Sequence, residues 1–481
     1  MEIIRRRRFE QYSDMIARLY PELSVVNNNN DGTGKKVLSR TVTFQVTDNC
    51  NLACKYCYQI NKGKRKMSFE IAKKFVDLLL SGEKGFSDYV NPEISPALII
   101  EFIGGEPFME VELIDQICDY FFKEAIRLDH PWAMRHCISI CSNGVLYTDP
   151  RVQRFLWKHR DNLSFSVTID GNKELHDSCR VFHDGSPSYD IAVAAAKDWM
   201  DRGHYMGSKI TIAPGNITYL YDAIVHMIDL GYDEIHANCV YEEGWELHHA
   251  TELYWQMKRI ADYMLDHNLE LNTAMALFED NFFRPKHVDD LDNWCGGTGS
   301  MLSCDPDGYL YPCIRYMESS LGCDRPPLRI GSVDEGLGLT DEHTEVINCL
   351  NCVNRRSEST DECFYCPIAE GCSWCSAYNY QVNGTPDSRV TYICIMHKAR
   401  AIANAYFWSK VYVKHNVPEE YELFVPTEWA LEIIPAEEWD MILNLPKIVH
   451  RTDPDYIKQC QLPTKPHKEE IEEMIANEVN S

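Results

Sequence analysis

The chain has 481 residues, and its 47 lysines and arginines stand against 73 aspartates and glutamates, which gives a formal net charge of -26. This balance disfavours nonspecific binding to DNA or RNA, because such binding requires a basic surface. No apolar run is long enough to cross a bilayer, and none follows the arginines at 5–8, so the sequence predicts neither a membrane span nor an export signal.

Alternating strand-like and helix-like runs fill residues 40–267, which is typical of parallel βα units. Strands are predicted over residues 41–46, 97–103, 137–142, 163–169, 209–212 and 234–240. Helices are predicted over 68–80, 110–128, 188–203, 216–231 and 246–267, and from Asp149-Pro150 onward, with Ser68, Ser188 and Asn216 as caps. Six units do not close an eight-stranded barrel, so the predicted fold is α/β, a partial (β/α)6 TIM-like barrel with its site at the carboxyl ends of the strands.

The remaining residues are predicted to form an N-terminal extension (1–39), a connector (268–294), a cysteine-rich domain (295–400) and a C-terminal extension (401–481). The stretch 295–394 holds eleven of the twenty cysteines and few long helical patterns, so bound metal would have to replace an apolar core there. Helices are predicted at 400–413 and near 468–478.

The cysteines fall into tight local clusters, and neighbours separated by two residues often share a metal. Without an export signal, the expected compartment is the reducing cytoplasm. Cys50, Cys54 and Cys57 form a C-x3-C-x2-C group directly after the first predicted strand. Three thiolates can hold three irons of a [4Fe–4S] cubane and leave the fourth iron open for a ligand. Zinc is the alternative, although structural zinc sites use four ligands.

This group and three further segments resemble the radical S-adenosylmethionine superfamily. Tyr56 fills the aromatic place in the cysteine motif. GGEP at 104–107 follows the second strand, SNG at 142–144 follows the third, and TIDG at 168–171 follows the fourth, with Arg180 beyond. Because four short motifs occur in the family's order after the expected strands, the chain is identified as a member by resemblance.

The resemblance implies that a reduced [4Fe–4S] cluster at Cys50, Cys54 and Cys57 cleaves S-adenosylmethionine to methionine and a 5′-deoxyadenosyl radical, which abstracts hydrogen from an unactivated C–H bond. It also implies a one-electron donor such as flavodoxin or ferredoxin. The residues that it assigns to S-adenosylmethionine binding are Tyr56, Gly104, Gly105, Glu106, Ser142, Thr168 and Arg180.

The cysteine-rich region resembles the SPASM domain of radical enzymes that modify peptides. The resemblance implies two auxiliary [4Fe–4S] clusters, one held by Cys363, Cys366, Cys372 and Cys394, the other by Cys295, Cys313 and Cys375. The final C-x2-C departs from the usual C-x3-C, which weakens the assignment of Cys375. Cys304, in a hairpin that turns at Asp307-Gly308, is the candidate fourth ligand of the second cluster.

Other cysteines are assigned less specifically. Cys349 and Cys352 form an extra C-x2-C that would add a ligand, bind zinc or be reactive, and a zinc-knuckle scaffold is the alternative for the whole region. Cys179 is interpreted as core or loop filler, and the residues predicted to lie in the core are Cys118, Cys137, Cys141 and Cys239.

The expected activity is thioether formation between a cysteine sulfur of a ribosomally synthesised precursor peptide and a carbon of another residue. If Cys304 points away from the second cluster, that cluster keeps an open iron, which would bind the substrate thiolate and keep it deprotonated. The string at 311–317 also resembles maturases whose targets carry Cys-x-x-x repeats. Only 49 residues precede Cys50, so we expect a separate leader-binding protein, recognition by the tail, or no leader recognition.

Three alternatives remain. In similar enzymes that make formylglycine in sulfatases, an aspartate general base directly follows the cysteine that closes the hairpin, and here Ile314 occupies that place. Peptide C–C cross-linking or epimerisation is the second alternative, and no feature singles out a thiol hydrogen donor. A non-enzymatic scaffold is the third, but it has no need of GGEP or Arg180.

Overall fold

The computed structural model describes residues 39–279, 282–293, 295–322 and 325–463. The predicted helix near 468–478 and the N-terminal extension up to residue 38 lie outside these ranges. Within the described residues, no helix combines the length and the apolar character needed to cross a bilayer.

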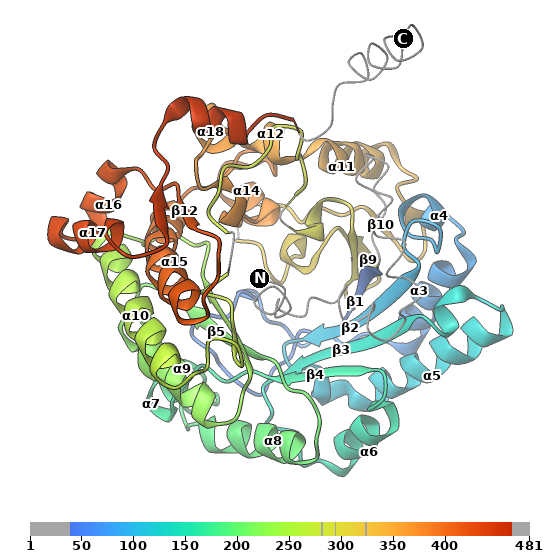
Figure 1. Cartoon of the computed structure of the whole chain (residues 1–481). Coiled ribbons are helices and arrows are strands. Elements are labelled where there is room, and N and C mark those ends of the chain that lie inside the picture. Colours follow the sequence, from blue (N-terminus) through green and yellow to red (C-terminus); the bar gives the residue numbers. More distant parts are fainter. Residues whose placement is uncertain (1–38, 280–281, 294, 323–324, 464–481) are drawn as a thin grey trace, which may run out of the picture.

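Six parallel strands form the inner part of the molecule, with helices around them (Figure 1). The strands are β1 (Ser39–Thr47), β2 (Ala97–Gly104), β3 (His136–Ser142), β4 (Leu163–Val167), β5 (Ser208–Ile212) and β6 (Glu234–Cys239). The main helices between and after them are α3 (Phe69–Ser81), α5 (Val111–Arg127), α6 (Pro150–His159), α8 (Tyr189–Asp201), α9 (Leu220–Asp229) and α10 (Leu247–Asp266), with shorter α4 (Phe86–Tyr89) and α7 (Lys173–Cys179). The predicted partial α/β barrel is confirmed.

The strands belong to two sheets rather than one. β5 and β6 pair with each other and with β7 (Ala274–Met275), but not with β4. On the opposite side, β8 (Met301–Cys304) pairs in parallel with β1 and continues through a hairpin into β9 (Tyr309–Tyr311), β10 (Gly331–Ser332) and β11 (Gly336–Leu337). The main sheet therefore runs β11-β10-β9-β8-β1-β2-β3-β4, and the cysteine-rich region begins inside the barrel's own sheet.

Two of the predicted helix starts carry the expected caps. The Ser68 hydroxyl accepts the Ile71 N–H at 3.2 Å, and the Asp149 carboxylate accepts the Arg151 N–H at 2.8 Å. Ser188 occupies the N-cap position of α8 as predicted, but its hydroxyl donates to the Arg180 carbonyl at 2.7 Å and accepts no helix N–H. Asn216 likewise stands at the expected helical start without a side-chain cap.

The Asn216 amide oxygen accepts the Ala213 N–H at 2.8 Å instead, and a short 3-10 turn (Ile217–Tyr219) precedes α9. Both side chains thus stabilise the preceding loop, an alternative that short polar residues offer the backbone.

One face of the main sheet packs on the helices. Phe44 of β1 contacts Phe75 of α3 at 4.8 Å between ring centroids, and Phe102 of β2 at 5.5 Å. Because side chains alternate along a strand, the neighbouring positions point to the opposite, inner face.

The inner face of the main sheet carries a row of polar side chains. Thr43, Glu101, Ser139 and Ser164 are paired positions across β1 to β4, and Ser303 continues the row on β8. The Thr43 hydroxyl donates to the Glu101 carboxylate at 2.7 Å, and burial raises the pKa of Glu101. TIM-type barrels usually fill their interior with branched apolar side chains, so this interior is polar by comparison.

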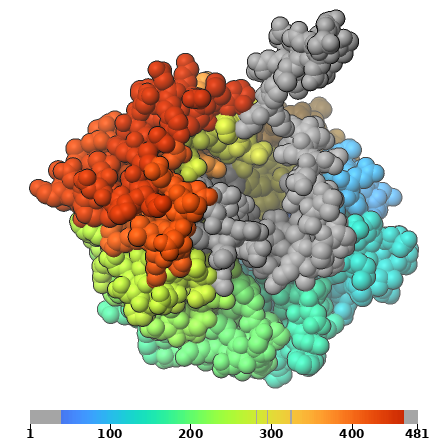
Figure 2. Space-filling model, in the orientation of Figure 1, coloured from blue at the N-terminus to red at the C-terminus, as the bar shows by residue number. Residues whose placement is uncertain are grey.

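The C-terminal part packs against α10. Helix α15 (Cys394–Lys414) starts earlier than predicted, at Cys394, and lies along α10. In Figure 2 the described residues from about 400 to 463 form one orange-red block beside the yellow-green residues of α10. The other elements after residue 340 are α11 (Asp341–Cys352), α12 (Arg355–Glu358), α13 (Asp361–Phe364), α14 (Ser376–Asn383), β12 (Tyr421–Leu423), α16 (Thr427–Ile433), α17 (Ala436–Leu443), β13 (Ile448–His450) and α18 (Pro454–Cys460).

Candidate cofactor and cluster sites

Cys50, Cys54 and Cys57 lie in the loop after β1, here called the cysteine loop. Its backbone is fixed by hydrogen bonds from the Ala53 N–H to the Val181 carbonyl at 2.8 Å and from the Cys57 N–H to the Cys54 carbonyl at 3.3 Å. Burial raises the pKa of Cys50 and Cys54, so these thiols keep their protons unless a cation is bound nearby. Iron–sulfur clusters supply such charge and take cysteine sulfur as ligand, so the donor set fits a cluster.

Gly104 is the last residue of β2 and lies against the end of β1, and Gly105, which follows it, lies against the start of the cysteine loop. The Gly105 N–H donates to the Thr47 carbonyl at 2.9 Å, and the Glu106 N–H donates to the Asn49 carbonyl at 2.9 Å. A β-carbon on Gly105 would lie 2.2 Å from the Asn49 carbonyl oxygen, and one on Gly104 would lie 2.8 Å from the Thr47 carbonyl oxygen. Only glycine at these two positions therefore allows the two backbone segments to lie so close together.

Glu106 connects the GGEP segment to the SNG segment. Its carboxylate accepts hydrogen bonds from the Ser142 hydroxyl at 2.7 Å, the Asn143 N–H at 2.9 Å and the Phe108 N–H at 3.2 Å. Burial raises the pKa of Glu106 and these hydrogen bonds oppose that effect. In the structure Glu106 and Ser142 thus contact each other, and their contact with S-adenosylmethionine stays a prediction.

Tyr56 and Arg180 meet at Asp170, a residue that the sequence did not single out. The Tyr56 hydroxyl donates to the Asp170 carboxylate, and the Arg180 guanidinium donates to the Tyr56 hydroxyl at 2.6 Å. The guanidinium lies 3.9 Å from the carboxylate. Asp170 falls within the TIDG segment, so the motif was the signal that could have identified it.

Three buried polar atoms in or beside this network have no hydrogen-bond partner in the described part of the chain. They are Nε of Arg180, Oδ1 of Asp170 and the side-chain nitrogen of Asn51, which follows Cys50. Buried polar groups are nearly always hydrogen-bonded in complete proteins. Unsatisfied donors at the cysteine loop fit the binding of a polar ligand such as S-adenosylmethionine.

Thr168, another predicted contact, lies beside Cys141. Its hydroxyl is 3.2 Å from the Cys141 thiol, and Cys141 is exposed. The prediction that Cys141 lies in the core is wrong, because residue 141 is on the inner face of β3, paired with Ser166 of β4. Cys118 and Cys137 are buried as predicted, and Cys239 is half-buried.

His176 provides a test of this site through pH. Its ring is buried, and burial together with Arg180 lowers the pKa of His176 from 6.5 to about 3. At a pH between about 3 and 6.5, His176 binds a proton in the unfolded chain but not in the folded chain. The stability that His176 contributes is therefore complete above pH 6.5 and is lost as the pH falls toward 3.

We expect the free energy of unfolding to fall by about 2 kcal/mol through His176 between pH 7 and pH 5. Urea unfolding of the wild type and of His176→Gln at both pH values measures this. The difference in free energy of unfolding between the wild type and the variant should be smaller by that amount at pH 5 than at pH 7. His248→Gln, at an exposed histidine, is the control. An advantage that does not change with pH would contradict the prediction.

Cys295, Cys313 and Cys375 come together from three separate segments and are here called the three-cysteine group. A β-carbon on Gly297 would lie 3.4 Å from Cys313 Sγ and 3.6 Å from Cys295 Sγ. Cys375, at the start of α14, is an electrostatic neighbour of both thiols. Burial raises the pKa of Cys313, and the other two thiols raise it further.

Cys363, Cys366, Cys372 and Cys394 form a separate four-cysteine group. Burial raises the pKa of Cys366 to about 11 and that of Cys372 to about 12, and in both cases Cys363 and Cys394 add to the rise. Arg389 donates to Cys372 Sγ at 3.8 Å. These thiols are thus electrostatic neighbours of one another, and their role as ligands of an auxiliary cluster stays a prediction.

Cys304 lies apart from the three-cysteine group. It is fully buried on β8, paired with Phe44 of β1, and its thiol donates to the Asp305 carbonyl at 3.5 Å. The charged neighbour that raises its pKa, after burial, is Asp305 rather than another cysteine. Cys349 and Cys352 are exposed on the last turns of α11.

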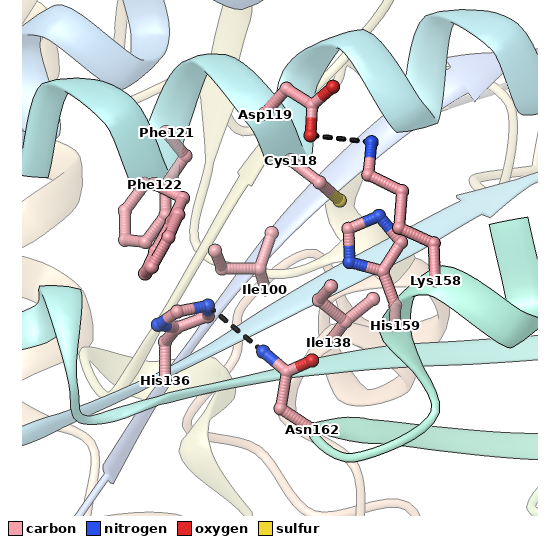
Figure 3. A pocket seen from close by; sticks show the side chains of 10 residues that line it. All are labelled: Ile100, Cys118, Asp119, Phe121, Phe122, His136, Ile138, Lys158, His159 and Asn162. Carbon is pink, nitrogen blue, oxygen red and sulfur yellow. Dashed lines mark hydrogen bonds and ion pairs between the residues drawn. The ribbon is translucent and has the colours of Figure 1, made fainter.

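A separate cavity of about 260 Å³ lies on the helix side of the sheet (Figure 3). Its apolar wall includes Ile100 and Ile138. Lys158 closes one side through ion pairs of 2.6 Å with Asp119 and 2.7 Å with Asp115. The cavity is lined by residues of α5 and α6, and both carboxylates of its acidic pair, Asp115 and Asp119, form ion pairs with Lys158.

The chain is similar to several known proteins. No protein-family model matches the chain. The chain is 32% identical over 149 residues to a serine-type anaerobic sulfatase-maturating enzyme of Bacteroides thetaiotaomicron, covering 29% of this chain and 31% of that one. It is 22% identical over 354 residues to the radical SAM cyclopropyl synthase TigE of Paramaledivibacter caminithermalis, covering 71% and 68%. The matches thus span about a third of the first relative and two thirds of the second.

A solved structure shares the fold. The enzyme anSMEcpe with bound AdoMet and the Cp18Cys peptide superposes with a TM-score of 0.56 and 16% sequence identity. The match covers 79% of this chain and 99% of that chain. The fold of most of this chain is therefore one already seen in a protein whose structure holds both AdoMet and a peptide.

Proposed function

Because the chain is a member of the radical S-adenosylmethionine superfamily, we propose that it is a maturase that modifies a ribosomally synthesised peptide. The relatives support this proposal, since one matures a sulfatase and the solved neighbour holds a cysteine peptide. An electron donor such as flavodoxin or ferredoxin, and a separate leader-binding protein, belong to the same proposal.

The cysteine loop would hold the cluster through Cys50, Cys54 and Cys57. When bound, that cluster and S-adenosylmethionine supply a 5′-deoxyadenosyl radical for hydrogen abstraction. Gly104 and Gly105 let the end of β2 lie directly against the loop, and Arg180 offers its unpartnered Nε to the ligand. The side chains of Tyr56 and Asp170 hold the guanidinium in place.

The proposed reaction is thioether formation in a cysteine-containing precursor peptide. The observation that carries it is the three-cysteine group, because Cys304 is directed elsewhere and three thiolates leave one iron of an auxiliary cubane open. The substrate thiol would lose a proton, the acceptor carbon would lose a hydrogen atom, and one electron would leave as the S–C bond forms. The four-cysteine group would complete a second auxiliary cluster.

Formylglycine formation is the second candidate, because the relative that is 32% identical matures a sulfatase. Ile314 is the first residue of the short 3-10 helix after Cys313, and it offers no carboxylate there. Oxidation of a serine or cysteine therefore requires a base from another part of the site.

Mass spectrometry of a cysteine-rich peptide encoded beside the gene, co-expressed with this chain, tests the proposal. Each thioether removes two hydrogen atoms and protects the sulfur from alkylation. An aldehyde that reacts with hydrazides would favour formylglycine instead. Absence of 5′-deoxyadenosine after anaerobic reconstitution and reduction with S-adenosylmethionine would contradict both candidates.

A further inference from the structure

Arg315 connects the cysteine loop to the three-cysteine group. It lies two residues after Cys313, and its guanidinium is 5.7 Å from the ring centroid of Tyr58, the residue after Cys57. It is also 6.0 Å from the ring centroid of Tyr378, three residues after Cys375. One side chain thus contacts segments adjoining both predicted clusters.

The guanidinium has spare hydrogen-bonding capacity. Its one hydrogen-bond partner among the described residues is Glu242, in the loop after β6, at 3.1 Å. A guanidinium has five N–H donors, so most of them remain for a ligand. The Arg315 side chain is 22% exposed, so part of it is accessible to solvent and to a ligand.

The charge at this position is not fully balanced by its partner. Glu242 is itself 46% exposed, so solvent screens much of that ion pair. The thiols of Cys375 and Cys313 are the other electrostatic neighbours of the guanidinium. A further anion arriving between the three-cysteine group and Tyr58 would therefore meet a cation already in place.

We propose that Arg315 binds the cysteine thiolate of the substrate where that thiolate meets the three-cysteine group. This inference rests on the proposed function, because it needs an open iron at that group. Binding releases one proton from the substrate thiol to solvent and transfers no electron. The arginine offsets the negative charge that a fourth thiolate brings to a cluster already held by three.

Arginine suits this role better than lysine. Its guanidinium carbon lies within 6.0 Å of the ring centroids of Tyr58 and Tyr378, close enough for cation–π attraction, and a planar guanidinium still presents N–H donors at its edge. A lysine would keep the charge but lose the fixed orientation. Glu242 would hold the guanidinium in position before the substrate arrives.

The test uses the full-length chain with Cys50, Cys54 and Cys57 replaced by alanine, so that only auxiliary clusters remain. After anaerobic reconstitution and reduction, its EPR spectrum is recorded during titration with N-acetylcysteine amide, a neutral thiol. Arg315→Gln and Arg315→Lys are compared in this background. Arg329→Gln is the matched control, since Arg329 also lies over a tyrosine ring, that of Tyr309, at 3.7 Å.

We expect the thiol concentration for half-conversion to rise about 10-fold in Arg315→Gln, equivalent to roughly 1.4 kcal/mol, to rise less in Arg315→Lys, and to stay unchanged in Arg329→Gln. Iron content identifies a variant that lost its cluster. If Arg315→Gln has lost it, the thiol affinity of Arg315→Lys tests the proposal instead. Equal thiol affinity in the parent and the Arg315 variants would overturn the role of Arg315 alone. A parent spectrum that never responds to thiol would overturn the open iron as well, and with it the proposed thioether chemistry.

Discussion

Replacing Cys54 by alanine is expected to lower 5′-deoxyadenosine release more than about 100-fold, because only two protein ligands of the cluster would remain. Cys54 lies in a loop whose backbone is already fixed by hydrogen bonds to residues 179 and 181, so the substitution removes a ligand without removing the loop. The measurement is chromatographic detection of 5′-deoxyadenosine after anaerobic reconstitution and reduction with S-adenosylmethionine.

Cys118→Ala is the matched control for this experiment. Cys118 is buried on α5, on the helix side of the sheet, and the substitution deletes the same sulfur. We expect it to cost about 1 kcal/mol of stability and to leave cofactor cleavage near the wild-type rate. Equal activity in Cys54→Ala and Cys118→Ala would show that the cysteine loop does not hold the catalytic cluster.

The second large effect is expected from Gly105→Ala. The new methyl group would lie 2.2 Å from the carbonyl oxygen and 2.4 Å from the carbonyl carbon of Asn49, so the backbone has to move. That movement displaces the residue before Cys50 and breaks the hydrogen bond from the Gly105 N–H to the Thr47 carbonyl. We expect an about 100-fold lower rate of S-adenosylmethionine cleavage, since small displacements of reacting groups have effects of this size.

Gly215→Ala provides the comparison, because a β-carbon there meets no atom within 4 Å. Circular dichroism and iron content distinguish a misplaced loop from an unfolded protein. If Gly105→Ala cleaves S-adenosylmethionine as fast as Gly215→Ala, the close approach of β2 to the cysteine loop is not needed for the reaction.

Local signals in the sequence predicted much of the barrel. Apolar runs such as 97–103 appear as strands, because a strand buried in a parallel sheet needs apolar side chains along its length. Ser68 and Asp149 predicted helix starts correctly because their caps bond to residues only two or three positions away. Ser188 and Asn216 also stand at the expected helical starts, but their side chains bond to loop partners and not to the helix N–H groups.

Long-range pairing was beyond the reach of these signals. Nothing local in residues 301–304 indicates that they pair with β1, more than 250 positions earlier, and nothing local separates β4 from β5. The exposure of Cys141 and the contact of Tyr56 with Asp170 likewise depend on which face of a strand or loop turns inward. Motifs from a known family identified the binding segments, whereas the contacts among them required the structure.

The pairing of β8 with β1 also affects self-association. A partial barrel would otherwise end at β1, a nine-residue strand whose free N–H and C=O groups could capture a strand from another molecule. Here the sheet continues outward and ends at β11, a strand of two residues. So short an edge offers little backbone for strand addition, and the cysteine-rich region thereby protects the barrel from aggregation along that side.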